Sequence, residues 1–157
     1  MIFHEPANYQ ENCVALFDEH KEIVHRLLPG AKIDHIGASV IEGAISKGDL
    51  DILVAVDFDV HSSSVETLEN AGFTIKKDSL RTAELCMMES SYDGVALQVV
   101  AVGSAFEHSF LGFRRALENS IDLRNAYNNL KRSSARLDMD SYRKRKSAFI
   151  QNVLLDS

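Results

Sequence analysis

The spacing of apolar residues predicts a chain that begins with a helix and continues into a sheet. From Tyr9 to Leu28 apolar side chains recur at helical intervals, and Pro29-Gly30 ends the pattern. Residues 49–56, DLDILVAV, are the strongest strand candidate, because a nearly continuous apolar run of this length is typical of a strand buried on both faces. Alternating or apolar runs predict four further strands, at 32–36, 73–77, 82–88 and 95–102.

Polar residues between these runs predict helix starts and turns. Ser63-x-x-Glu66 and Ser104-x-x-Glu107 have the capping-box pattern, which predicts that a helix opens at each place. Residues 90–94, SSYDG, are typical of a hairpin loop. We also expect one helical turn around 42–45 and a helix stop at Gly72. After Ser104 we expect helix to the end of the chain, with breaks near 119–120 and 136–140. Asp138 or Asp140 is expected to cap the last helix.

This order of elements predicts an α+β fold. We expect a mixed β-sheet of about five strands, with an N-terminal helix before it and a C-terminal helical segment after it. The length of 157 residues and the hydrophobic fraction of 45% fit a single domain, residues 1–157, that can bury a sizeable core. With 25% charged residues and two prolines, the composition excludes a disordered or low-complexity chain.

The sequence also predicts the compartment. Its apolar runs are too short to cross a bilayer, and the segment after Met1 lacks the basic and then apolar layout of a signal peptide. Two cysteines, Cys13 and Cys86, form neither a secreted disulfide framework nor a CxxC zinc site. We therefore expect a cytoplasmic protein with no membrane partner.

The net charge of −6 is unevenly distributed along the chain. Residues 1–113 carry seven basic and eighteen acidic side chains, whereas residues 114–157 carry ten basic and five acidic ones. A basic C-terminal third either forms an anion-binding wall, as a triphosphate requires, or consists of ordinary solvated helix faces. Aromatic residues are not interleaved with the basic ones, so specific nucleic-acid binding is not expected.

The most informative pattern is Gly37-Ala38-Ser39 followed, after nine residues, by Asp49-Leu50-Asp51. Because side chains alternate along a strand, Asp49 and Asp51 lie on the same side, where two buried carboxylates repel each other unless a cation neutralises them. Carboxylate oxygens suit Mg²⁺, and a turn of small residues lets backbone N–H groups approach a phosphate. Lys47 is expected at the mouth of this cleft. The alternative is that the two acids are solvated charges at a strand end.

These residues carry a resemblance to a known family. Residues 35–43, HIGASVIEG, and 47–54, KGDLDILV, resemble the pattern HhGSTxVPGL…KPhhDhhV (h, apolar) of the GrpB family, within the polymerase-β-like nucleotidyltransferase superfamily. Phe113-Arg114, Leu130-Lys131-Arg132 and residues 142–150 resemble that family's FR, LKR and terminal Y…K..FI motifs. The resemblance spans residues 33–153 in the correct order and implies a nucleotidyltransferase-like sheet.

The resemblance also implies an activity, Mg²⁺-dependent transfer of a nucleotidyl group from a nucleoside triphosphate to an unknown acceptor. Asp49 and Asp51 would then be the catalytic metal ligands. The residues expected to contact the nucleotide are Gly37, Ser39, Lys47, Lys131 and Lys146, and those expected beside the site are His35 and Gln98.

The chain departs from the superfamily pattern at three positions. Ala38 stands where Ser is preferred, Glu42 replaces a Pro, and Gln98 occupies the polar position of strand 95–102, where a third carboxylate is expected. Gln98 favours a second hypothesis, a degenerate fold that binds a nucleotide or a partner without transfer chemistry. A third hypothesis is a structural interaction domain, in which the acids have no ligand.

Overall fold

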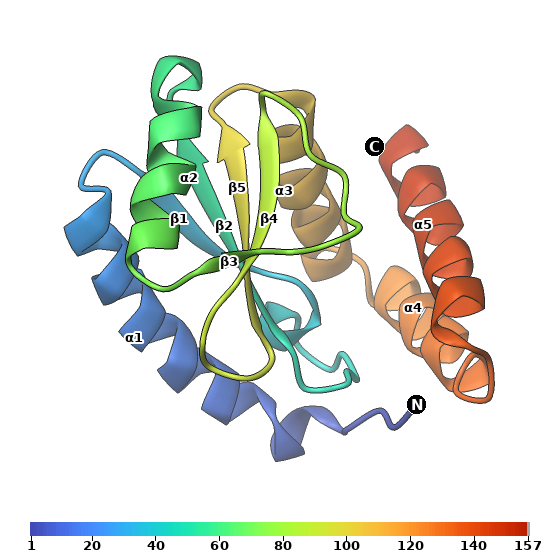
Figure 1. The fold of residues 1–157 in the computed structure, drawn as a ribbon. Helices are drawn as coiled ribbons and strands as arrows, with labels where there is room; N and C mark the ends of the chain where they lie inside the picture. Colours follow the sequence, from blue (N-terminus) through green and yellow to red (C-terminus); the bar gives the residue numbers. More distant parts are fainter. Residues whose placement is uncertain (157) are drawn as a thin grey trace.

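A mixed five-stranded sheet lies at the centre of the structure, a computed structural model that describes residues 1–156 (Figure 1). The strand order is β1-β2-β5-β4-β3, with β2 and β5 parallel and the other neighbours antiparallel. Because β2 and β5 occupy the inner positions, both of their faces are covered, which explains their long apolar runs. The strands are β1 (Lys32–Ile36), β2 (Leu50–Val56), β3 (Thr74–Ile75), β4 (Leu85–Glu89) and β5 (Val95–Ala101).

Helices cover both faces of this sheet (Figure 1). Helices α1 (Gln10–Leu27) and α2 (His61–Asn70) pack on the face that carries Ile52 and Val54, whereas α3 (Ala105–Glu118) packs on the opposite face, which carries Leu53 and Ala55. Helices α4 (Ile121–Ser133) and α5 (Met139–Leu155) lie beyond α3 and form a third apolar cluster with it. The expected α+β sheet with an N-terminal helix and a C-terminal helical segment is confirmed.

The strand predictions hold in position but differ in length. The expected strand 73–77 is reduced to the two residues of β3, and the expected strand 82–88 begins at Leu85, after an isolated bridge between Thr82 and Leu85. The hairpin between β4 and β5 is present, with Ser90 N–H donating to Val95 O at 2.9 Å. The short helical turn expected around 42–45 lies earlier, at Ala38–Val40, directly after β1.

Two of the three predicted helix caps form, and the predicted break near 119–120 is present. Ser104 Oγ accepts a hydrogen bond from Glu107 N–H, and Asp138 Oδ1 accepts one from Ser141 N–H, so α3 and α5 begin where the sequence predicts. The break near 119–120 is capped by Ser120. The capping box at Ser63 is wrong, because α2 begins at His61, whose Nε2 lies 2.9 Å from Val99 O, on the neighbouring β5. Across residues 1–156 no helix combines the length and apolar content that a membrane span needs.

Candidate functional site

A cavity of about 360 Å³ opens between the α3 face of the sheet, the loop that joins β1 to β2, and the C-terminal helices. Helices α3, α4 and α5 each contribute side chains to its wall, so the C-terminal segment folds over the sheet. Of the residues that the sequence predicts for a site, those that line this cavity are Gly37, Lys47, Asp49, Asp51, Gln98, Lys131 and Lys146. Two residues of the prediction, His35 and Ser39, do not.

Asp51 lies at the floor of the cavity, on the second residue of β2, where it pairs with Ile36 of β1 and Ala96 of β5. The turn after β1 passes directly over its carboxylate. Gly37 has a φ of +79°, and a Cβ atom built on it would lie 2.9 Å from Asp51 Oδ2. Glycine is therefore required at this position by both its backbone conformation and the space available.

The electrostatics of Asp51 reflect competing effects. Burial raises the pKa of its carboxyl, and the neighbouring Asp49 raises it further, whereas the positive charges of Lys146, Lys76 and Lys47 lower it. Burial is the largest of these effects, so the pKa is raised overall. The positive charges of the neighbouring lysines therefore only partly offset the effect of burial on the Asp51 carboxyl.

Asp49 stands immediately before β2 and faces the same cavity from a more open position. Its side chain is 52% exposed, and its Oδ2 lies 3.8 Å from Lys47 Nζ. Its Oδ1 lies 3.5 Å from the position that a Cβ on Gly94 would occupy, so the β4–β5 hairpin passes beside it. The two carboxylates line one cavity, as alternation along the strand predicts, with Asp51 deep and Asp49 at the rim.

Gln98 faces the cavity from β5, on the same side of the sheet as Asp51. Ala96 pairs with Asp51, and Gln98 pairs with Leu53. Gln98 therefore lies two residues further along the parallel strands than Asp51. Its Oε1 is buried and has no hydrogen-bond partner among residues 1–156, and its amide makes no hydrogen bond to either aspartate. Within that part of the chain no three acidic, histidine or cysteine side chains gather into a metal-binding group.

Lys131 and Lys146 reach the cavity from α4 and α5. Lys131 is only 2% exposed, donates to Ile45 O, and holds its Nζ 3.8 Å from the centre of the Tyr127 ring. Burial lowers its pKa to about 7, and the charge of Lys146 acts in the same direction. The pKa of Lys146 is raised, chiefly by Tyr127 and also by Tyr142 and Asp51, so this lysine stays charged.

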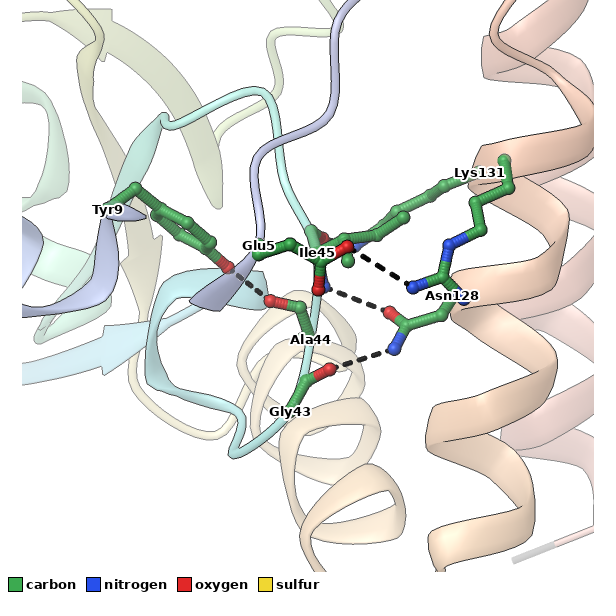
Figure 2. A network of polar contacts seen from close by, with 8 residues as sticks. Glu5, Tyr9, Gly43, Ala44, Ile45, Asn128 and Lys131 are labelled. Carbon is green, nitrogen blue, oxygen red and sulfur yellow. Dashed lines mark hydrogen bonds and ion pairs between the residues drawn. The ribbon is translucent and has the colours of Figure 1, made fainter. Parts of the chain in front are cut away.

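A polar network fastens the β1–β2 loop to α4 (Figure 2). Asn128 accepts from Ile45 N–H at 3.0 Å and donates through Nδ2 to Gly43 O at 2.8 Å. On the other side of the loop, Tyr9 OH donates to Ala44 O at 2.8 Å. Asn128 and Tyr9 were not predicted from the sequence, since each lies far along the chain from the loop that it holds. The network sets where the loop, and therefore Lys47 and Asp49, stand relative to the helices.

Ser39 and His35 face away from the cavity and bond to each other. Ser39 is 2% exposed and its Oγ lies 2.7 Å from His35 Nε2, so the hydroxyl is not directed at a phosphate. His35 lies on the α1 side of the sheet, with its ring centre 4.9 Å from that of Phe17. Burial, reinforced by the charge of Arg114, lowers the His35 pKa to about 4. The pair braces the turn behind Gly37.

The cavity wall is strongly cationic. Its basic residues include three that were not predicted for the site, and the full set is Lys47, Lys76, Arg114, Lys131, Arg143 and Lys146. Among residues 1–156 the acids that line it are Asp49 and Asp51. Arg114 is held in place by a 3.0 Å hydrogen bond from Nη1 to His35 O and by ion-pair distances of 3.9 Å to Asp34 and 3.4 Å to Glu118. Four of the six, Arg114, Lys131, Arg143 and Lys146, belong to the basic segment 114–157, so the charge asymmetry of the sequence was the signal for most of this wall.

Comparisons with known proteins agree on one family. The model of the family described as GrpB protein matches residues 6–155. A UPF0157 protein of Vibrio cholerae is 47% identical over 155 residues, covering 98% of this chain and 82% of its own length. A UPF0157 protein of Deinococcus radiodurans is 31% identical over 142 residues, covering 89% and 74%.

Solved structures agree on the fold. The crystal structure of the conserved protein GrpB from Enterococcus faecalis matches 97% of this chain and 94% of its own, with 21% identity and a TM-score of 0.79. The Cid1 poly(U) polymerase with bound MgGTP matches 81% of this chain and 42% of its own, with 17% identity and a TM-score of 0.55. At these identities the likeness concerns the fold alone, which is nucleotidyltransferase-like.

Proposed function

Because this chain belongs to the GrpB family and has a nucleotidyltransferase-like fold, we propose that its cavity binds a nucleoside triphosphate together with Mg²⁺ and transfers the nucleotidyl group to an acceptor. One observation carries the proposal. The carboxylates of Asp49 and Asp51 face a cationic cavity directly beneath the Gly37 turn. Carboxylates beside a turn that approaches a phosphate, with lysines around them, are what a metal-bound triphosphate needs.

The residues present fit a divalent ion. Asp49 and Asp51 offer carboxylate oxygens, and the buried Oε1 of Gln98, which lacks a hydrogen-bond partner within residues 1–156, offers a neutral one on the same face. Oxygen donors of these two kinds are the ligands that Mg²⁺ accepts. When bound, Mg²⁺ supplies Lewis-acid stabilisation of charge on the reacting phosphate oxygens.

The other residues of the cavity orient and hold the triphosphate. The main-chain N–H groups after Gly37 approach a phosphate closely, because glycine leaves no side chain in the way. Lys47 and Lys146 act as point charges on the phosphate oxygens. Lys131 binds Ile45 O, and it becomes fully charged when an anion enters beside it.

Thermal denaturation tests the binding half of this proposal. A ligand that binds only the folded chain raises the melting temperature, so each nucleoside triphosphate with Mg²⁺ is compared with Mg²⁺ alone. We expect a rise for wild type and none for Asp49→Asn or Asp51→Asn. Asp57→Asn, an exposed acid at the opposite end of β2, should behave as wild type. Absence of any rise in wild type would overturn the proposal.

Pyrophosphate release tests the transfer half. Wild type and Asp51→Asn are incubated with each Mg-nucleotide, with and without the small-molecule fraction of a bacterial extract as a source of acceptors. Release that depends on Asp51 supports transfer. Gln98 favours a second candidate, a non-catalytic nucleotide-binding protein, because a neutral amide cannot supply the charge of a third carboxylate. Nucleotide binding without pyrophosphate release would favour this second candidate.

A further inference from the structure

Lys76 enters the cavity from the far edge of the sheet, in line with Gln98. Its N–H donates to Met87 O at 2.9 Å, Met87 pairs with Gln98, and Gln98 pairs with Leu53. These contacts place Lys76, directly after β3, in one row with Met87 of β4 and Gln98 of β5. Met87 packs in the apolar cluster on the α3 side, so the row belongs to the face that carries Asp51.

The ammonium of Lys76 is available to a ligand. Among residues 1–156 it forms no ion pair within 4 Å, although the residue lines the cavity. Lys76 and Asp51 line the same cavity. The matched neighbour Lys77 is exposed and does not line the cavity.

Two divalent ions need more negative charge than the side chains of this cavity provide. Two Mg²⁺ ions carry four positive charges, and Asp49 and Asp51 together carry two negative ones. Gln98 adds no negative charge, whereas Lys76 adds a positive one to the same row. A second ion in the cavity would therefore be repelled by Lys76 and lack a carboxylate of its own.

We propose that the ammonium of Lys76 takes the place of a second divalent ion in this cavity, so that the site holds a single Mg²⁺ and binds polyphosphate directly through Lys76. The inference rests on the proposed nucleotide site, and it adds that part of the polyphosphate affinity is independent of metal. It also implies that Gln98 and Lys76 act together, since an acid at 98 would form an ion pair with Lys76 before it could bind a metal.

Calorimetric titration with inorganic tripolyphosphate tests the direct contact. In excess EDTA we expect wild type and Lys77→Met to bind equally, and Lys76→Met to bind roughly tenfold more weakly, as the loss of one charge-assisted contact predicts. Equal affinity of Lys76→Met and wild type, or wild-type binding only when Mg²⁺ is present, would overturn this inference and leave the proposed function standing. No binding by wild type with or without Mg²⁺ would contradict the proposed function itself.

The number of bound Mn²⁺ ions, counted by electron paramagnetic resonance in the presence of tripolyphosphate, tests the replacement. We expect a single ion for wild type and for Gln98→Asp, and two ions for the double variant Gln98→Asp/Lys76→Met. Two ions in wild type, or a second ion in Gln98→Asp alone, would contradict the proposal. Circular dichroism checks that each variant is folded, and the calorimetric result for Lys76→Met stands independently because Lys76 is exposed.

Discussion

Gly37 and Asp51 are so close that a single methyl group on the first would collide with the carboxylate of the second. The Cβ of Gly37→Ala would lie 2.9 Å from Asp51 Oδ2, with the backbone at a φ of +79°. Both the left-handed conformation and the contact are unfavourable for alanine, so we expect a loss of about 1–3 kcal/mol in the free energy of unfolding. Urea denaturation measures it.

Two other glycines separate the causes of that loss. Gly43 has a similar φ of +78° but open space around it, so Gly43→Ala reports the backbone strain alone. Gly30 has neither a positive φ nor a neighbouring atom within 4 Å, and Gly30→Ala should change stability by less than about 0.5 kcal/mol. Equal losses for Gly37→Ala and Gly43→Ala would show that Asp51 yields freely to the methyl group.

Asp51→Asn should leave the unliganded protein as stable as wild type or make it more stable at neutral pH. The folded carboxyl has a pKa above its ordinary value of 3.8, so between these two pKa values the folded chain binds more protons than the unfolded chain. Wild-type stability relative to Asp51→Asn therefore falls as the pH rises above about 4. Urea denaturation from pH 4 to 8 measures the difference, and a gain for wild type over that range would contradict the raised pKa.

Lys131 should make the free energy of unfolding depend on pH with the opposite sign. Its folded pKa of about 7 lies below its ordinary value of 10.5, so between them the unfolded chain binds the extra proton. Stability contributed at this position should therefore increase from pH 7 to pH 10, because the folded chain no longer holds a buried charge. Lys131→Met should abolish this increase, whereas Lys144→Met, at an exposed position of α5, should retain it.

His35 should remain neutral well into the acid range. With a folded pKa of about 4 and an ordinary value of 6.5, the unfolded chain takes up a proton first as the pH falls. The contribution of His35 to the free energy of unfolding is thus complete above pH 6.5 and declines toward pH 4. His35→Gln should reduce that decline. His25→Gln, at an exposed position of α1, serves as the control. A nuclear magnetic resonance titration of His35 with a midpoint near 6.5 would contradict the burial argument.

The fold was predictable where the hydrophobic pattern of a segment decides its structure. The run 49–56 is apolar because β2 is an inner strand, and the helix over 10–27 follows its spacing. The start of α2 depends on a tertiary contact as well as on local pattern. His61 binds Val99 O on β5, and this tertiary contact starts the helix before Ser63.

In the candidate site, too, the features set by local pattern were predictable and those set by the strand order were not. Asp49 and Asp51 share a side because alternation is a local property of a strand. The row that joins Lys76 to Gln98 depends on the strand order β5-β4-β3, which local pattern does not reveal. Ser39 differs from its predicted orientation because the short helical turn at 38–40 directs its hydroxyl to His35.

The hydrogen bonds between α4 and the β1–β2 loop have a consequence for how a ligand enters. Tilting α4 away from the sheet would break both hydrogen bonds of Asn128 and that of Lys131 together, at roughly 1 kcal/mol or more each. Wide opening between sheet and helices is therefore a rare event, and the cavity exists in nearly its final shape before anything binds. Such a preformed pocket selects its ligand by size and charge, with little change in its own shape. Residues of both the acidic segment 1–113 and the basic segment 114–157 form its wall. We therefore expect residues 1–113 and 114–157 to unfold in a single transition, because this network and the apolar cluster of α3, α4 and α5 join them.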